Sequence, residues 1–66
     1  MNKAQLQASL AFNGETLAEA ENTLRRIQAE PYPQRPYFQE RLNAARRLVY
    51  EIKAHQCRLQ EQLAAL

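Results

Sequence analysis

Two stripes of regularly spaced residues, one on each side of a proline-rich segment, constrain the fold of this chain more than any other feature. Within each stripe the spacing alternates between four and three residues. This spacing places a stripe on one face of an α-helix, as in the seam of a coiled coil. The first stripe comprises Leu6, Leu10, Asn13, Leu17, Ala20, Leu24 and Ile27, and the second comprises Phe38, Leu42, Ala45, Val49, Ile52, Gln56, Leu59, Leu63 and Leu66.

The segment between the stripes cannot continue a helix. It contains Pro31, Pro33 and Pro36, and proline both lacks the backbone donor and disfavours helical geometry in the residue before it. We therefore expect an all-α fold, an antiparallel two-helix hairpin with a coiled-coil seam, forming a single domain over residues 1–66. The first helix should span residues 3–30, the proline-rich turn 31–36 and the second helix 36–65, with Pro36 in its first turn.

The position of the turn fixes which residues of the two stripes face each other. A turn centred near residue 34 pairs residues whose numbers add up to about 69, such as Ile27 with Leu42. The polar members of the stripes, Asn13 and Gln56, then share one layer, and we interpret this layer as a structural device that fixes the register. Beside the stripes, the same register places Glu21 opposite Arg46 and Glu30 opposite Arg41.

The first helix carries a start signal and a weak point. Asn2 can cap its N-terminus, with Gln5 at the capping-box position. Asn13 and Gly14 form a dipeptide that favours turns, but the stripe passes through it without losing phase. We expect a continuous helix that is weakened at Gly14, because glycine within a helix costs about 1 kcal/mol relative to alanine.

A hairpin of this size buries little apolar surface, so it should need a partner. Domains of fewer than about 70–80 residues usually rely on staples or on association, and the single Cys57 cannot form an internal disulfide. We expect a homodimer of hairpins that forms a four-helix bundle; docking on a different protein is the alternative. The residues expected on this dimer or partner face are Leu48, Tyr50 and Phe12.

The composition argues against catalysis. The chain has no Asp, one His and no phosphate-binding glycine loop, and His55 with Cys57 supplies too few ligands for a metal site. We expect no enzymatic activity, cofactor, metal or small-molecule substrate. No apolar run approaches the roughly 20 residues that cross a bilayer, and a lone cysteine is typical of a reducing compartment. A cytoplasmic protein without a membrane partner is the expectation.

Charge is distributed unevenly along the chain. Residues 25–47 contain six Arg and two Glu, a net charge of +4, whereas the remaining residues sum to −2. Folding back at the prolines gathers the arginines at the turn end of the rod. Tyr32 and Tyr37 bracket Arg35 there, so aromatic rings lie beside guanidinium groups. The candidate partner-binding residues are Tyr32, Arg35, Tyr37 and Arg41, supported by Arg25, Arg26, Arg46 and Arg47.

The leading hypothesis for function is a small interaction module that acts as an adaptor, inhibitor or regulator of a larger protein. Arginine and tyrosine are the residue types that anchor protein interfaces, and a stiff turn loses little entropy on binding. The alternative is a regulator that binds RNA or DNA through the arginines, although the patch is small and lysine is scarce. A second alternative is a structural spacer or assembly protein.

Overall fold

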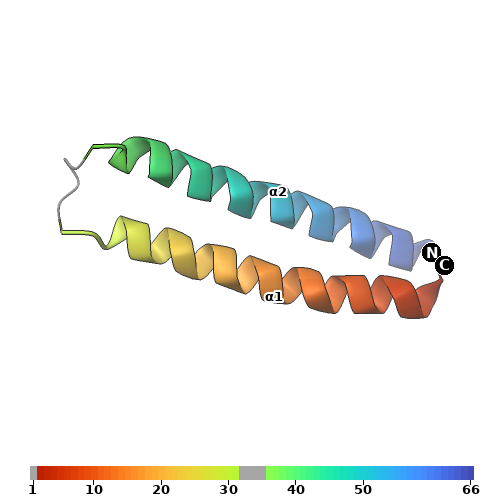
Figure 1. Cartoon of the computed structure of the whole chain (residues 1–66). Coiled ribbons are helices and arrows are strands. Elements are labelled where there is room, and N and C mark those ends of the chain that lie inside the picture. The colour runs from red at the N-terminus through yellow and green to blue at the C-terminus, as the bar shows by residue number, and fades with distance from the viewer. Residues whose placement is uncertain (1, 32–35) are drawn as a thin grey trace.

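The chain forms a hairpin of two helices packed against each other in the computed structural model, which describes residues 2–31 and 36–66. Helix α1 spans Lys3–Gln28 and helix α2 spans Phe38–Ala64. The helices run antiparallel, and the two termini lie together at one end (Figure 1). The molecule is a rod with extents of 49 × 14 × 12 Å. The expected helical hairpin is confirmed, and both helices are slightly shorter than predicted.

Helix α1 begins at the capping box that its sequence indicates. The side chain of Asn2 accepts a hydrogen bond from the backbone N–H of Gln5 at 2.8 Å, and the backbone N–H of Asn2 donates to Oε1 of Gln5 at 3.0 Å. These bonds satisfy two donors that the first helical turn leaves unpaired. The helix then runs unbroken through Gly14 to Gln28, so the turn-favouring dipeptide does not interrupt it.

Helix α2 begins two residues later than the proline pattern predicts. Its N-cap is Tyr37, whose φ of 66° and ψ of 7° lie in the left-handed region, and Pro36 stands outside the helix. We attribute the shift to Phe38, which packs partly buried against the cluster of Ile27, Leu42 and Ala45. Bringing Phe38 onto this cluster requires the chain to reverse sharply just before it, and Tyr37 makes that reversal.

The core is the line of contact between the two stripes. In α1 the buried residues recur at every seventh position, which is the spacing of one helix face in contact with a partner helix. In α2 the buried residues alternate by three and four over most of the helix. The buried residues are Leu6, Asn13, Ala20 and Ile27 in α1, and Leu42, Ala45, Val49, Ile52 and Leu59 in α2.

The packing clusters contain the residues that the register pairs. Ile27, Leu42 and Ala45 form one cluster, and Ala20, Val49 and Ile52 form another. Leu24 packs against both clusters and Leu17 against the second, so large and small side chains interdigitate.

Asn13 is buried in the helix interface, with 7 % of its surface exposed. Its Nδ2 donates to the backbone carbonyl of Ile52 at 3.4 Å, one turn of α2 before Gln56. Gln56 is half-buried. The amide of Asn13 therefore ties α1 to the backbone of α2 by a long bond.

No helix among residues 2–31 and 36–66 is long and apolar enough to cross a lipid bilayer.

Candidate functional site

The described arginines of the charged segment lie towards the turn end of the rod. Arg25 and Arg26 occupy the last turn of α1, where positive charge also offsets the negative end of the helix dipole. In α2, Arg41, Arg46 and Arg47 lie within the first three turns and all are exposed. Tyr32 and Arg35, the central pair of the predicted contact, lie outside the described residues.

One arginine at this end is held by an ion pair that links the two helices. Arg41 donates two hydrogen bonds to the carboxylate of Glu30, at 3.1 Å and 2.6 Å, in the fork geometry of a strong guanidinium–carboxylate pair. The side-chain hydrogen bond, followed by Coulomb attraction to Glu30, raises the pKa of Arg41. Of the two ion pairs that the register predicts, Glu30–Arg41 forms, whereas Glu21 and Arg46 are not joined.

Arg41 keeps donors for a further ligand. A guanidinium has five N–H groups, of which Glu30 engages two, and the Arg41 side chain remains 46 % exposed. Arg25 donates a hydrogen bond to the side chain of Asn22 within α1. The turn end thus combines one anchored guanidinium with several that extend into solvent.

Tyr37 has an unusual backbone for its side chain. It is the one non-glycine residue with positive φ in the described part of the chain, and the residue is 74 % exposed. Left-handed geometry costs an ordinary residue about 1–2 kcal/mol, and Tyr37 does not recover this by burying its ring or by capping α2 with its side chain. The backbone reversal at this position serves the packing of Phe38, but the tyrosine side chain itself adds no evident stability in return for the strain.

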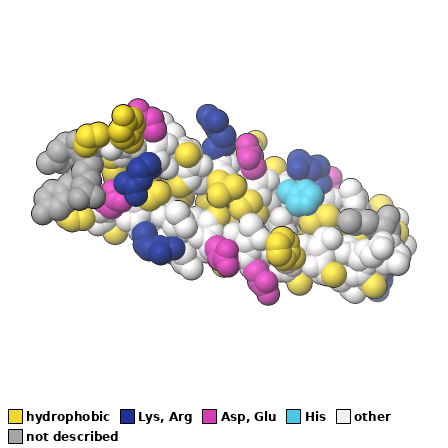
Figure 2. Space-filling model, in the orientation of Figure 1, with side chains coloured by type: hydrophobic (Ala, Val, Ile, Leu, Met, Phe, Trp, Pro, Cys, Tyr) yellow, Lys and Arg dark blue, Asp and Glu magenta, His cyan; other side chains and the backbone are white. Residues whose placement is uncertain are grey.

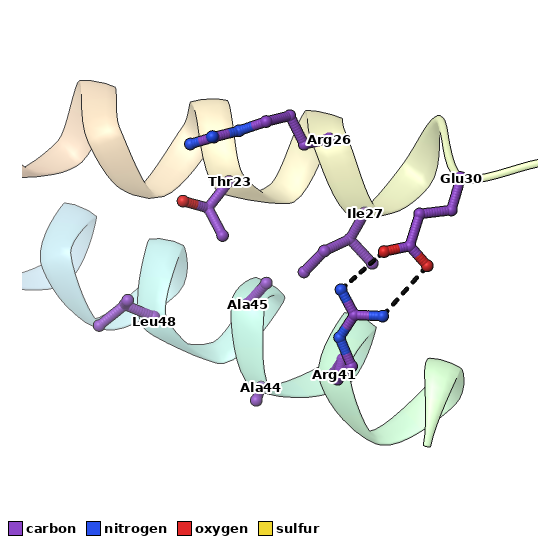
Figure 3. Close-up of a pocket in the computed structure, with 8 residues that line it drawn as sticks. All are labelled: Thr23, Arg26, Ile27, Glu30, Arg41, Ala44, Ala45 and Leu48. Atoms are coloured by element: carbon purple, nitrogen blue, oxygen red, sulfur yellow. Dashed lines mark hydrogen bonds and ion pairs between the residues drawn. The ribbon is translucent and has the colours of Figure 1, made fainter. Parts of the chain in front are cut away.

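A groove opens between the two helices close to the turn end. Its volume is about 670 Å³. Ile27 and Ala45 form its apolar floor, Leu48 borders it half-exposed, and Arg26 and the Glu30–Arg41 pair stand at its edges (Figure 3). The turn-end groove is lined by Thr23, Arg26, Ile27, Glu30, Arg41, Ala44, Ala45 and Leu48.

A second groove, nearer the termini, has a volume of about 420 Å³. It is bordered by Phe12, which is 71 % exposed, and by His55 on the opposite helix. The terminal groove is lined by Ala8, Ser9, Phe12, Asn13, Thr16 and His55.

Both grooves lie on one face of the hairpin, which we call the groove face. Phe12 and Arg26 are two heptads apart on α1, and Leu48 and His55 are one heptad apart on α2, so each pair projects in nearly the same direction. Figure 2 shows one face of the rod, with hydrophobic side chains gathered at its middle and charged side chains around them.

Tyr50 does not share this face. It is two residues from Leu48 and therefore about 200° further around α2, and it is 74 % exposed. Leu48 and Phe12 can be covered by one flat partner surface, whereas Tyr50 requires another. The predicted dimer or partner face thus divides into two.

Sequence reasoning missed the groove residues Thr23 and Ala44. Each lies on the helix flank beside the stripe, where a small residue leaves space next to the core. One signal in the sequence could have indicated the groove. Ala44 and Leu48 are four residues apart on α2, so a small and a large side chain follow each other beside the buried stripe.

Within the described residues, no group of three His, Cys, Asp or Glu side chains is arranged to hold a metal ion. What the site offers is guanidinium donors beside an open apolar groove, a combination typical of protein interfaces.

Comparison of the chain with protein-family models, curated proteins and solved structures finds no match.

Proposed function

We propose that this chain is a non-enzymatic protein–protein interaction module, an adaptor, inhibitor or regulator that binds a larger protein through the turn end of its rod. The observation that carries the proposal is the strained, exposed Tyr37 among the clustered arginines. Glycine or asparagine would make the same reversal with less strain, and a strained residue whose own side chain does not stabilise the fold is characteristic of binding and catalytic sites.

The chemistry of the turn end favours an acidic protein surface. Arg41 is pre-oriented by Glu30, so little side-chain entropy is lost when its remaining donors meet a carboxylate. The tyrosine ring adds apolar area beside these donors. A regulator that binds RNA or DNA with the same residues is the competing function.

The two functions differ in how binding depends on salt. A nucleic-acid complex that neutralises several phosphates loses orders of magnitude in affinity between 50 and 200 mM salt, because counterions are released. A protein interface with an apolar centre loses much less. Capture of partners from cells by the tagged chain, with and without nuclease and at both salt concentrations, separates the two.

A charge-matched pair of variants tests the location of the contact. Arg26→Glu with Arg47→Glu reverses two charges near the turn, and Lys3→Glu with Arg58→Glu makes the same change in net charge nearer the termini. We expect the first pair to abolish capture of a nuclease-resistant protein and the second pair to retain it. Equal capture by both would refute the turn-end contact, and loss of all capture after nuclease treatment would favour the nucleic-acid function.

Self-association into a four-helix bundle, in a cytoplasmic protein, is the second part of the proposal. Tyr50 is the large apolar side chain exposed on the face opposite the grooves, and Arg46 and Lys53 flank it on α2. A second copy related by a two-fold axis along the rod would bring Glu21 of each copy near these basic residues of the other.

The matched control for this dimer is Tyr37, a residue as exposed as Tyr50. We expect Tyr50→Ser to raise the dimer dissociation constant at least tenfold in sedimentation equilibrium, and Tyr37→Ser to leave it unchanged. A dimer that tolerates Tyr50→Ser uses another face.

A further inference from the structure

We propose that the groove face binds one amphipathic helix of the partner protein, which lies along both grooves and completes a three-helix bundle. This inference rests on the proposed function and specifies the partner's chemistry. The helix carries apolar anchors two heptads apart, acidic residues at the end nearest the turn and basic residues at its middle.

The spacing of the grooves defines the length of the helix. Arg26 borders the turn-end groove and Phe12 borders the terminal groove, fourteen residues away on α1. At about 1.5 Å per residue this separation is about 21 Å, or four helical turns. One straight helix of about 20 residues therefore places one apolar anchor in each groove. This is the helix-in-groove mode of recognition, in which side chains at helical spacing enter an apolar channel.

The charges at the turn end and at the middle of the groove face indicate the charges expected of the partner at these two levels. Arg26 and the partly exposed Arg41 stand at the turn-end groove, where acidic side chains would be attracted. Midway between the grooves stand two exposed acids: Glu19, seven residues from both Phe12 and Arg26, and Glu51, seven residues from Ala44. Basic side chains at the middle of the partner helix would meet them. Such complementarity fixes the register and raises the association rate.

A second copy of this chain fits the groove face poorly. Leu48 borders the turn-end groove itself, so Phe12 is the large exposed apolar side chain that the rest of this face could offer to the turn-end groove of another copy. Seating it there, with the rods antiparallel, places the two-fold axis halfway between residues 12 and 26, at Glu19. Each Glu19 would then face its own equivalent, and like charges in contact are unfavourable. The groove face therefore favours a different protein.

The test uses the 66-residue chain and two synthetic 21-residue helical peptides of identical composition. Both carry leucines at two positions two heptads apart; one has glutamates at one end and lysines at its middle, and the other has these charges exchanged. We expect the first peptide to bind in fluorescence anisotropy at least tenfold more tightly than the second. We also expect Ala44→Glu, which fills the turn-end groove, to weaken this binding at least tenfold. Ala54→Glu, the same change at a residue that lines neither groove, should leave binding unchanged.

Several results would overturn the inference. They are no binding of the first peptide, equal binding of the two peptides, or equal binding to the Ala44→Glu and Ala54→Glu variants. Loss of the dimer in Ala44→Glu, with the dimer retained in Tyr50→Ser, would make a second copy the occupant and would also overturn it. The proposed function fails separately, when reversal of Arg26 and Arg47 leaves partner capture intact, so the two failures are distinguishable.

Discussion

Replacing Gly14 by alanine should stabilise the hairpin by an amount that the structure constrains closely. A methyl group at Gly14 would meet no atom within 4 Å outside its own helix turn, so the substitution neither adds a contact nor creates a clash. The remaining effect is the backbone term, which favours alanine over glycine within a helix by about 1 kcal/mol. In a domain of this size, 1 kcal/mol raises the melting temperature by about 4–8 °C.

Circular dichroism at 222 nm, followed through thermal unfolding, measures this shift. The matched control is Ala18→Gly, the opposite change one turn further along α1 at an exposed position, and it should lower the melting temperature by a similar amount. Both variants should be compared at two chain concentrations tenfold apart, because dimerisation would make the melting temperature depend on concentration. If Gly14→Ala leaves the melting temperature unchanged or lowers it while Ala18→Gly lowers it, the backbone at Gly14 does not gain stability from a helical residue, and α1 is not a continuous helix there.

Three further predictions concern the helix interface and the turn end. Asn13→Leu should raise the free energy of unfolding by about 1–2 kcal/mol in urea titrations, because the buried amide makes only a long hydrogen bond and the Ile52 carbonyl keeps its helical donor. A lower free energy of unfolding would show that the amide contributes more than its geometry indicates. Tyr37→Asn should stabilise the chain by about 1 kcal/mol, since asparagine tolerates left-handed geometry, and should weaken partner capture. A lower free energy of unfolding in this variant would show that the backbone at position 37 is not strained. Arg41→Gln should lower the melting temperature in dilute buffer and have a smaller effect in 1 M salt, where the ion pair with Glu30 is screened. A change in melting temperature that is independent of salt would mean that Arg41 acts through packing.

The heptad spacing and the prolines predicted the hairpin because both act locally and agree with each other. Period and phase determine which face of each helix is buried, and the turn position then determines which residues meet. The Glu30–Arg41 pair followed from that register. Glu21 and Arg46 satisfy the same arithmetic without pairing, since exposed ion pairs gain little free energy over solvated charges.

The grooves could not be predicted in this way, because they depend on volume rather than on period. Ala44 and Ala45 read as ordinary helix formers in the sequence, and only the packed helices reveal that their small side chains leave a channel beside Ile27. Leu48 and Tyr50, by contrast, are separated by helical period rather than by volume, although both were predicted on one dimer or partner face. Their separation around α2 follows from their two-residue offset once the buried stripe of α2 is fixed.

The entry to α2 is where local preference and the fold disagree, and this disagreement bears on function. Pro36 favours a helix that starts at once, yet the chain inserts a left-handed tyrosine before Phe38 reaches the core. Glycine or asparagine at position 37 would make the same reversal with less strain. A sequence that is otherwise consistent with its fold tends to break such a rule where a side chain is needed for another purpose. An exposed aromatic ring beside arginines is a side chain suited to binding a partner, which is why the strain at Tyr37 weighs more in the proposed function than the charge of the turn end alone.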